Sequence, residues 1–305
     1  MRNIFVKKLI RRARKNKNIF FISADLGYNS FEIFKKEFPD QFINVGVAEN
    51  NMIGIAAGLG LLKNEVYVYS IVPFVVFRSF EQIRNNLCHT NLNVKILGGG
   101  GGFSYGDQGI SHNTSEDISI MNTLPNIKIF SPGSKSETEL MIDKMFENKG
   151  PSYMRLGKVS SLDYKYDKKK FKLGDGITVK DGSDLIIITH GNIIDNVLEV
   201  INNLKKRKIN AKLISFPCVK PISNDFLKKN LSINQNIVII EENTKLGGLG
   251  GVVKDFLLEN NYKNRVKHIF LKDIVHDKIG SQNYLRNLNN LSVNKMIKII
   301  INFLN

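Results

Sequence analysis

The chain has 305 residues, 42% of them hydrophobic, and no apolar run in it approaches the length of a membrane-spanning helix. Its net charge of +16 comes from 44 Lys and Arg against 28 Asp and Glu, and these basic residues are spread along a sequence without tryptophan. A nucleic-acid groove needs a basic stripe with interleaved aromatic residues, which this sequence lacks. We therefore expect no binding to nucleic acid or membrane, and a core large enough for two domains.

The two cysteines, Cys88 and Cys218, lie far apart in the sequence. Their spacing fits neither a disulfide framework nor a metal site, and it favours a reducing, cytoplasmic environment. The basic N-terminus is not followed by an apolar core and a cleavage site, so we expect no signal peptide.

Apolar runs alternate with helical patterns along the whole chain. The first half contains an amphipathic helix, a longer helix that ends near Gly60, and five apolar runs read as strands, at 18–23, 66–72, 93–97, 124–130 and 152–157. The second half has three more such runs, at 184–189, 211–215 and 236–241. This alternation is typical of parallel sheets covered by helices on both faces. We predict an α/β fold with two three-layer α/β/α domains and mostly parallel sheets, over residues 1–160 and 176–305, joined by a linker at 161–175.

Glu49 is a lone carboxylate at the start of the helix that ends near Gly60. The helix is otherwise apolar and rich in small residues, and Gly54 and Gly58 lie on a face that lets another backbone approach closely. Acidic residues favour helix N-termini, so the position alone is compatible with a structural role.

Pro73 ends the strand at 66–72, and Phe74 and Phe77 lead into the next helix. Aromatic residues at helical spacing belong to the core in most proteins. These two rings are therefore candidates for packing as well as for a binding pocket.

Glycine-rich segments in this chain invite two cofactor interpretations that the context does not favour. Gly98 to Gly102 follow a strand, but a dinucleotide site needs a helix directly afterwards, and here a loop continues to Thr114. Gly174-Asp175-Gly176 follows the linker and precedes a strand, so we interpret it as a turn.

Several parts of this sequence resemble the transketolases, which depend on thiamine diphosphate. Residues 46–59 match the family pattern "GVxExNMxGIAxGL", whose glutamate hydrogen-bonds the pyrimidine ring of the cofactor. The resemblance therefore implies that Glu49 activates the cofactor, and it assigns Phe74 and Phe77 to the aromatic pocket for the pyrimidine.

A further segment and one arginine concern the substrate. Residues 106–113 resemble the family's "GEDGxxHQ", which implies that His112 faces the carbonyl and hydroxyl end of the substrate. A histidine exchanges protons readily near neutral pH. Arg155 matches the arginine that grips the substrate phosphate. From the residues alone, a loop histidine and a surface ion pair remain alternatives.

Two positions depart from the family. Gln108 stands where an aspartate reads a sugar hydroxyl, and Gly100 stands where a histidine helps to hold the phosphate. An amide still hydrogen-bonds hydroxyl groups. The resemblance with these changes implies small sugar or sugar-phosphate substrates other than the usual pentose and hexose phosphates.

The resemblance covers about residues 20–305, including "EENTKLGGLGG" at 241–251, which is similar to the family's C-terminal domain. The domain that holds the diphosphate and Mg²⁺ has no counterpart. This implies the C-terminal subunit of a split transketolase, which transfers a two-carbon ketol unit only together with a separate N-terminal subunit. The partner would hold Mg²⁺, thiamine diphosphate would lie across the interface, and two copies of each subunit would associate into a heterotetramer.

Two alternatives remain at this stage. The β subunit of a 2-oxoacid dehydrogenase shares the two-domain plan and a comparable glutamate. A non-catalytic assembly partner would share the fold alone.

Overall fold

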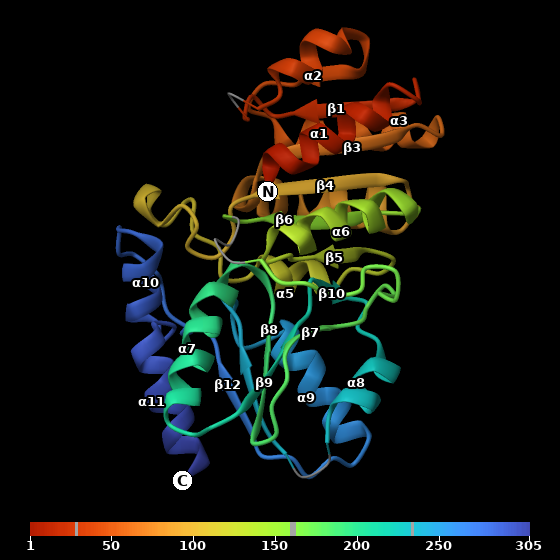
Figure 1. Ribbon diagram of the computed structural model, residues 1–305. Helices are drawn as coiled ribbons and strands as arrows, with labels where there is room; N and C mark the ends of the chain where they lie inside the picture. Colours follow the sequence, from red (N-terminus) through yellow and green to blue (C-terminus); the bar gives the residue numbers. More distant parts are fainter. Residues whose placement is uncertain (28–29, 159–162, 233–234) are drawn as a thin grey trace.

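The computed structural model describes residues 1–27, 30–158, 163–232 and 235–305. Two α/β domains are stacked along the long axis of the molecule, with the first domain at the top of Figure 1 and the second below it. Each is a mostly parallel sheet between layers of helices, which confirms the predicted fold class.

The helices and strands of the first domain follow the predicted alternation. They are α1 (Arg2–Ala13), β1 (Ile19–Ser23), α2 (Glu32–Glu37), η1 (Pro39–Gln41), β2 (Phe42–Asn44), α3 (Glu49–Leu61), β3 (Glu65–Ile71), η2 (Phe74–Arg78), α4 (Phe80–Gln82), η3 (Ile83–Cys88), β4 (Val94–Gly99), η4 (Gly106–Gln108), α5 (Asp117–Asn122), β5 (Lys128–Phe130), α6 (Lys135–Glu147) and β6 (Ser152–Leu156).

The rest of the chain forms the second domain and returns one strand to the first. Its elements are β7 (Ile177–Lys180), β8 (Leu185–Thr189), η5 (Gly191–Ile193), α7 (Ile194–Lys206), β9 (Ala211–Ser215), β10 (Cys218–Lys220), α8 (Asn224–Asn230), β11 (Asn236–Ile240), α9 (Leu249–Glu259), β12 (Val266–Ile269), α10 (Gln282–Leu288) and α11 (Val293–Leu304).

The first sheet has the strand order β10-β5-β6-β4-β3-β1-β2, and every neighbouring pair is parallel except β10 with β5. Its strands are apolar on both sides because helices cover both faces. Helices α1 and α6 cover one face, and α3, η2 and α5 cover the other. The carboxyl ends of β3, β4 and β6 therefore meet at one edge, where ligands bind in open α/β sheets.

The second sheet has the order β12-β11-β8-β9-β7, with β7 antiparallel to β9 and the other pairs parallel. Helices α7 and α11 pack on one face, whereas α9 lies on the face that continues into the core of the first domain. Figure 1 shows α7, α10 and α11 together on one side of this sheet and α8 and α9 on the other.

Strand β10 crosses the predicted domain boundary. Residues 218–220 lie beyond the boundary at 176, yet they pair with β5 and complete the first sheet. One hydrophobic cluster also runs without a break from Ile22 and Val68 of the first sheet to Ile188 and Ile239 of the second. The two halves therefore share an apolar junction.

The described part of the predicted linker, residues 163–175, packs against the first domain. Tyr166 Oη donates a 2.9 Å hydrogen bond to the Ser136 carbonyl, and the Tyr164 hydroxyl donates to the buried Glu137 carboxylate. Residues 173–174 form a turn, as interpreted for Gly174-Asp175-Gly176.

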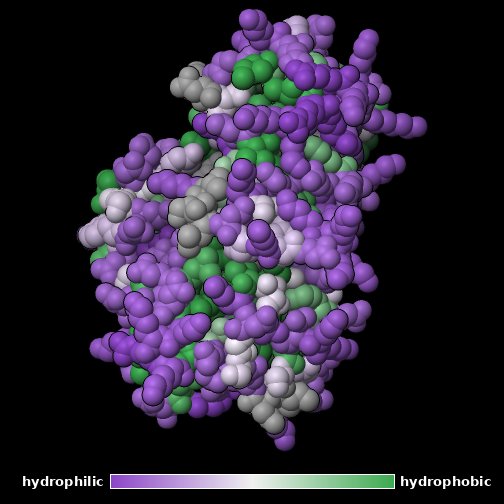
Figure 2. All heavy atoms as spheres, in the orientation of Figure 1, coloured by the Kyte–Doolittle hydropathy of each residue, from purple (hydrophilic) through white to green (hydrophobic). Residues whose placement is uncertain are grey.

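The face of the molecule in Figure 2 is mostly hydrophilic, with small separate hydrophobic areas. Among the described residues, no helix combines the length and the apolarity needed to cross a bilayer.

Candidate functional site

Glu49 begins α3 directly after the turn that leaves β2. Gly46 adopts a positive φ of 72° in this turn, a conformation that glycine reaches without steric cost. The Glu49 side chain is only 2% exposed, and its Oε1 accepts a 2.9 Å hydrogen bond from Ser70 Oγ near the end of β3. Because the N-terminus of a helix stabilises negative charge, a buried carboxylate is tolerated at this position.

Arg78 covers the outer side of this carboxylate. Its Nη1 lies 3.3 Å from Glu49 Oε2, and its side chain is 53% exposed. Its guanidinium also lies 4.6 Å from the centre of the Phe74 ring, a cation–π contact. Both Phe74 and Arg78 belong to η2, a π-helical turn, and such turns often occur at functional sites.

The Phe74 ring contacts His112 edge to face, with 5.1 Å between the ring centroids. The structure thus links Glu49, Phe74 and His112, which are far apart in the sequence: Arg78 contacts Glu49 and Phe74, and Phe74 contacts His112. This arrangement joins the start of α3, the π-helical turn and the loop after β4 in one cluster, which we call the Glu49 cluster.

The remaining residues of the predicted pocket lie nearer the surface. Phe77, in the same turn as Phe74, is 40% exposed, and Gln108 is exposed in η4. His112 is half-buried, and its Nδ1 lies 3.0 Å from Ser111 Oγ.

A cavity of about 430 Å³ opens at the carboxyl ends of β3, β4 and β6. Arg2, Tyr105 and Lys158 line it together with Gly100, one of the positions that departs from the family pattern. The Tyr105 ring also contacts His112, with 6.4 Å between centroids, so the cavity adjoins the Glu49 cluster. Two cationic side chains in such a cavity favour an anionic ligand.

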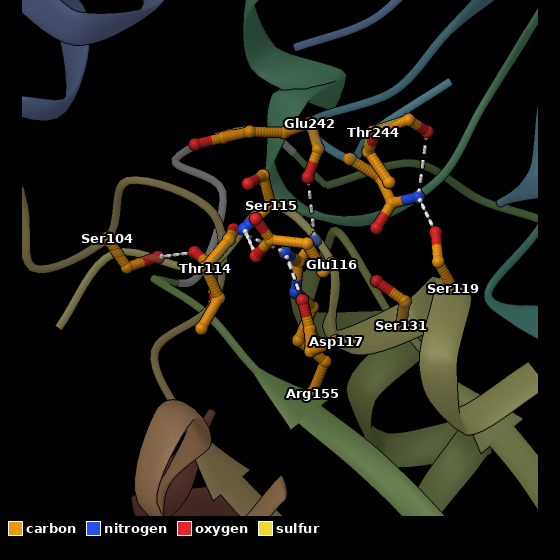
Figure 3. Close-up of polar contacts among 12 residues, drawn as sticks. Ser104, Thr114, Ser115, Glu116, Asp117, Ser119, Ser131, Arg155, Glu242 and Thr244 are labelled. Carbon is orange, nitrogen blue, oxygen red and sulfur yellow. Dashed lines mark hydrogen bonds and ion pairs between the residues drawn. The ribbon is translucent and has the colours of Figure 1, made fainter. Parts of the chain in front are cut away.

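Arg155 lies in a buried polar network at the domain junction (Figure 3). Its side chain is 6% exposed, with Nη2 2.9 Å from Asp117 Oδ1 and Nη1 donating to the Glu242 carbonyl at 3.1 Å. Tyr153 Oη donates to the second oxygen of Asp117 at 2.7 Å. Burial lowers the pKa of Arg155, but Asp117, Tyr153 and Glu242 together outweigh burial and raise the pKa above its ordinary value, so the guanidinium stays charged.

Glu241 is the centre of a second buried cluster, which contacts the backbone of the glycine-rich segment 247–251. It accepts hydrogen bonds from the backbone N–H groups of Leu249 and Gly250 at 3.0 Å and thereby caps α9. His190 and His268 contact its two oxygens at 3.3 and 2.7 Å. Burial raises the pKa of Glu241, but the hydrogen bonds from these histidines outweigh it and lower the pKa to about 2.

Comparison with known proteins decides the family. Residues 1–161, more than half of the chain, match the family described as "Transketolase, pyrimidine binding domain". The chain belongs to the transketolase family. Residues 174–294 match the "Transketolase, C-terminal domain", so the two halves correspond to two successive transketolase domains.

Relatives of similar length support this assignment. A "Putative transketolase C-terminal section" of Methanocaldococcus jannaschii is 34% identical over 90% of this chain and 87% of its own length. One of the subunits of the apulose-4-phosphate transketolase of Phocaeicola vulgatus is 32% identical over 90% of this chain and 89% of its own. A solved structure described as "Split gene transketolase, inactive beta4 tetramer" has a TM-score of 0.87 at 29% identity, over 99% of this chain and 97% of the other.

Three residues of the candidate site in this transketolase-family chain were missed by sequence reasoning. Ser70 has a sequence signal, since it is a polar residue in an otherwise apolar strand. Arg2 has none, because basic residues are frequent in α1. Arg78 is the one charged residue of η2, but only the tertiary structure places it against Glu49.

Proposed function

We propose that this chain is the C-terminal subunit of a split transketolase that transfers a two-carbon ketol unit between sugar phosphates. The observation that carries the proposal is the Glu49 cluster, in which a buried carboxylate, an aromatic ring and a histidine lie together beside a cation-lined cavity. The family assignment supports it, as do relatives of the same length that are named as parts of a transketolase.

The residues present fit the aminopyrimidine of thiamine diphosphate. Glu49 offers a buried carboxylate acceptor that only Ser70 and the half-exposed Arg78 contact within the described polar interactions, and Phe74 offers a partly exposed ring next to it. Glu49 would share a proton with a ring nitrogen, while Phe74 and Phe77 would hold the flat ring by stacking. When bound, the cofactor supplies the carbon nucleophile for the two-carbon transfer.

His112 would hold or move a proton at the oxygen of the substrate carbonyl, because it contacts both the Phe74 ring and Tyr105, which lines the cavity. Gln108, in the same loop, would hydrogen-bond a sugar hydroxyl.

The substrate that fits this cavity carries an anionic group at one end. Arg2 and Lys158 would bind a phosphate, in place of the histidine that Gly100 replaces. We propose a sugar phosphate outside the usual pentose and hexose phosphates, and one relative is named for apulose 4-phosphate. The predicted phosphate contact of Arg155 stays a prediction, and its charge is balanced here by Asp117.

A partner subunit would cover the outer face of α3. A Cβ added at Gly54 or Gly58 would meet nothing within 4 Å, so this face is open within the described chain. Val47 is 73% exposed before α3, and Leu61 and Leu62 are 66% and 74% exposed at its end. Such an apolar, small-residue face suits close packing against another backbone, and we propose that a separate subunit, which would hold the diphosphate and Mg²⁺, and a second copy of this chain meet near it in a heterotetramer.

The test is to purify the tagged chain with its co-purifying subunit and to assay the complex with ketose phosphates and aldehyde acceptors. We expect ketol transfer that depends on both subunits and on thiamine diphosphate. Glu49→Gln should lower kcat by about 10²- to 10⁴-fold, whereas Glu81→Gln, an exposed glutamate in α4, should leave it unchanged.

Other outcomes would point elsewhere. Decarboxylation coupled to acyl transfer would identify a 2-oxoacid dehydrogenase subunit instead. Full activity in the Glu49→Gln complex would show that this chain is an assembly partner without a catalytic carboxylate.

A further inference from the structure

The loop that carries His112 belongs to the first domain, and Phe103 anchors this loop to the second domain. This residue follows β4 of the first domain, yet its side chain is fully buried in the hydrophobic cluster of the second, with Leu185, Val238 and Leu285. Its ring also contacts His276 edge to face, with 5.1 Å between centroids. A side chain of the substrate loop is therefore part of the other domain's core.

The Glu242 carboxylate fastens the backbone at the same place. Its Oε1 accepts a 2.7 Å hydrogen bond from the Phe103 N–H, and its Oε2 accepts a 2.9 Å hydrogen bond from Arg286 Nε. Glu242 is 2% exposed. At Gly102, where φ is +58°, an added Cβ would lie 2.5 Å from Glu242 Oε1, so only glycine allows this close approach.

Two further contacts hold the next residues of the loop. The Gly280 N–H donates to the Gly106 carbonyl at 3.0 Å, and Asn192 Nδ2 donates to Ser104 Oγ at 3.4 Å. Residues 102–106 are thus attached to the second domain at three places. Gln108 and His112 follow in the same loop. Gln108 is exposed, and His112 is half-buried.

We propose that Glu242 and Phe103 are positioning residues, through which the second domain holds His112 and Gln108 in place for the substrate. The inference rests on the proposed function. Because Glu49 and Phe74 come from α3 and η2, outside this loop, loosening the anchor should leave binding of thiamine diphosphate intact and slow the transfer step. A catalytic group misplaced by about 1 Å costs on the order of 10²-fold in rate.

The experiment compares variants in the assembled complex by steady-state kinetics, thiamine diphosphate titration and hydrogen–deuterium exchange. Glu242→Ala and Phe103→Ala should lower kcat by about 10- to 100-fold, speed amide exchange in residues 103–113, and change the cofactor Kd by less than about twofold. Phe103→Leu keeps an apolar side chain and should recover much of the rate. Glu242→Gln keeps an oxygen acceptor for the Phe103 N–H but removes the charge that pairs with the buried Arg286, so it should recover less. Glu259→Gln, an exposed charge in the same domain, is the matched control.

The inference is overturned if kcat is unchanged while exchange in the loop accelerates. It is overturned as well if exchange accelerates equally throughout the second domain and the conservative variants recover nothing, since that pattern describes lost stability alone. Absence of ketol transfer in the wild-type complex would instead refute the proposed function, and the exchange data would still show whether Glu242 holds the loop.

Discussion

The ion pair between Arg155 and Asp117 should be strongly coupled, and a double-mutant cycle measures the coupling. Asp117 is fully buried and Arg155 is 6% exposed, with 2.9 Å between Nη2 and Oδ1. Removing one partner of a buried pair leaves the other charge uncompensated, which costs about 3–5 kcal/mol. We therefore expect Asp117→Asn and Arg155→Met each to lower the free energy of unfolding by about that amount.

In the double variant, the loss in free energy of unfolding should be about 2–3 kcal/mol smaller than the sum of the losses in the two single variants, because neither charge then remains unpaired. Since the chain has no tryptophan, urea unfolding is best followed by circular dichroism of the isolated chain. Tyr153 donates to Asp117 in the wild type, so Tyr153→Phe serves as a control that removes a hydrogen bond and no charge.

Additivity within about 0.5 kcal/mol would refute the reasoning, because it would mean that the two charges do not neutralise each other. The same variants test the predicted substrate contact. If Arg155→Met raised KM for a phosphorylated ketose and Asp117→Asn did not, Arg155 would have two roles: it would pair with Asp117 and would also bind the substrate.

Two other predictions concern charge. Arg2→Gln should raise KM for a phosphorylated ketose by about 10- to 100-fold, the loss expected for one charge-assisted hydrogen bond. Lys7→Gln on the same helix is the control. An equal rise in KM for substrates without phosphate would contradict the proposed role of the cavity. The pKa of Glu241 is lowered from 4.5 to about 2, so its ionised form contributes about 3 kcal/mol of stability that is present above pH 4.5 and lost as the pH falls toward 2. Unfolding free energies of the wild type and Glu241→Gln between pH 7 and 3 should therefore converge at the acidic end, and a constant difference would count against this assignment.

The buried parallel strands could be predicted because their apolar runs are continuous. Strands β3, β4, β8 and β11 are covered on both faces, and these segments of five to seven residues are too short for most helices, so their length identifies them as strands. Strand β10 could not be predicted from the sequence. Its residues Cys218–Lys220 lie between two prolines and resemble a turn, and its partner β5 is distant in the sequence.

The candidate site could be predicted only in part, again because some of its contacts join residues that are distant in the sequence. Glu49 has a local signal, a carboxylate at the start of a small-residue helix. The contact between Phe103 and Glu242 joins residues 139 positions apart, and neither residue type is unusual in its own segment. Long-range contacts of this kind depend on how the domains pack, which no local pattern encodes.

The order of strands in the first sheet also bears on how the chain is made. Strand β5 leaves the ribosome long before β10, so until Lys220 has been synthesised its outer edge is a row of unpaired backbone groups. Exposed edges of that kind recruit strands from other nascent chains, and domains generally fold in the order of synthesis. We therefore expect this edge to expose the nascent chain to aggregation in the interval between the synthesis of these two strands, when a chaperone could cover it.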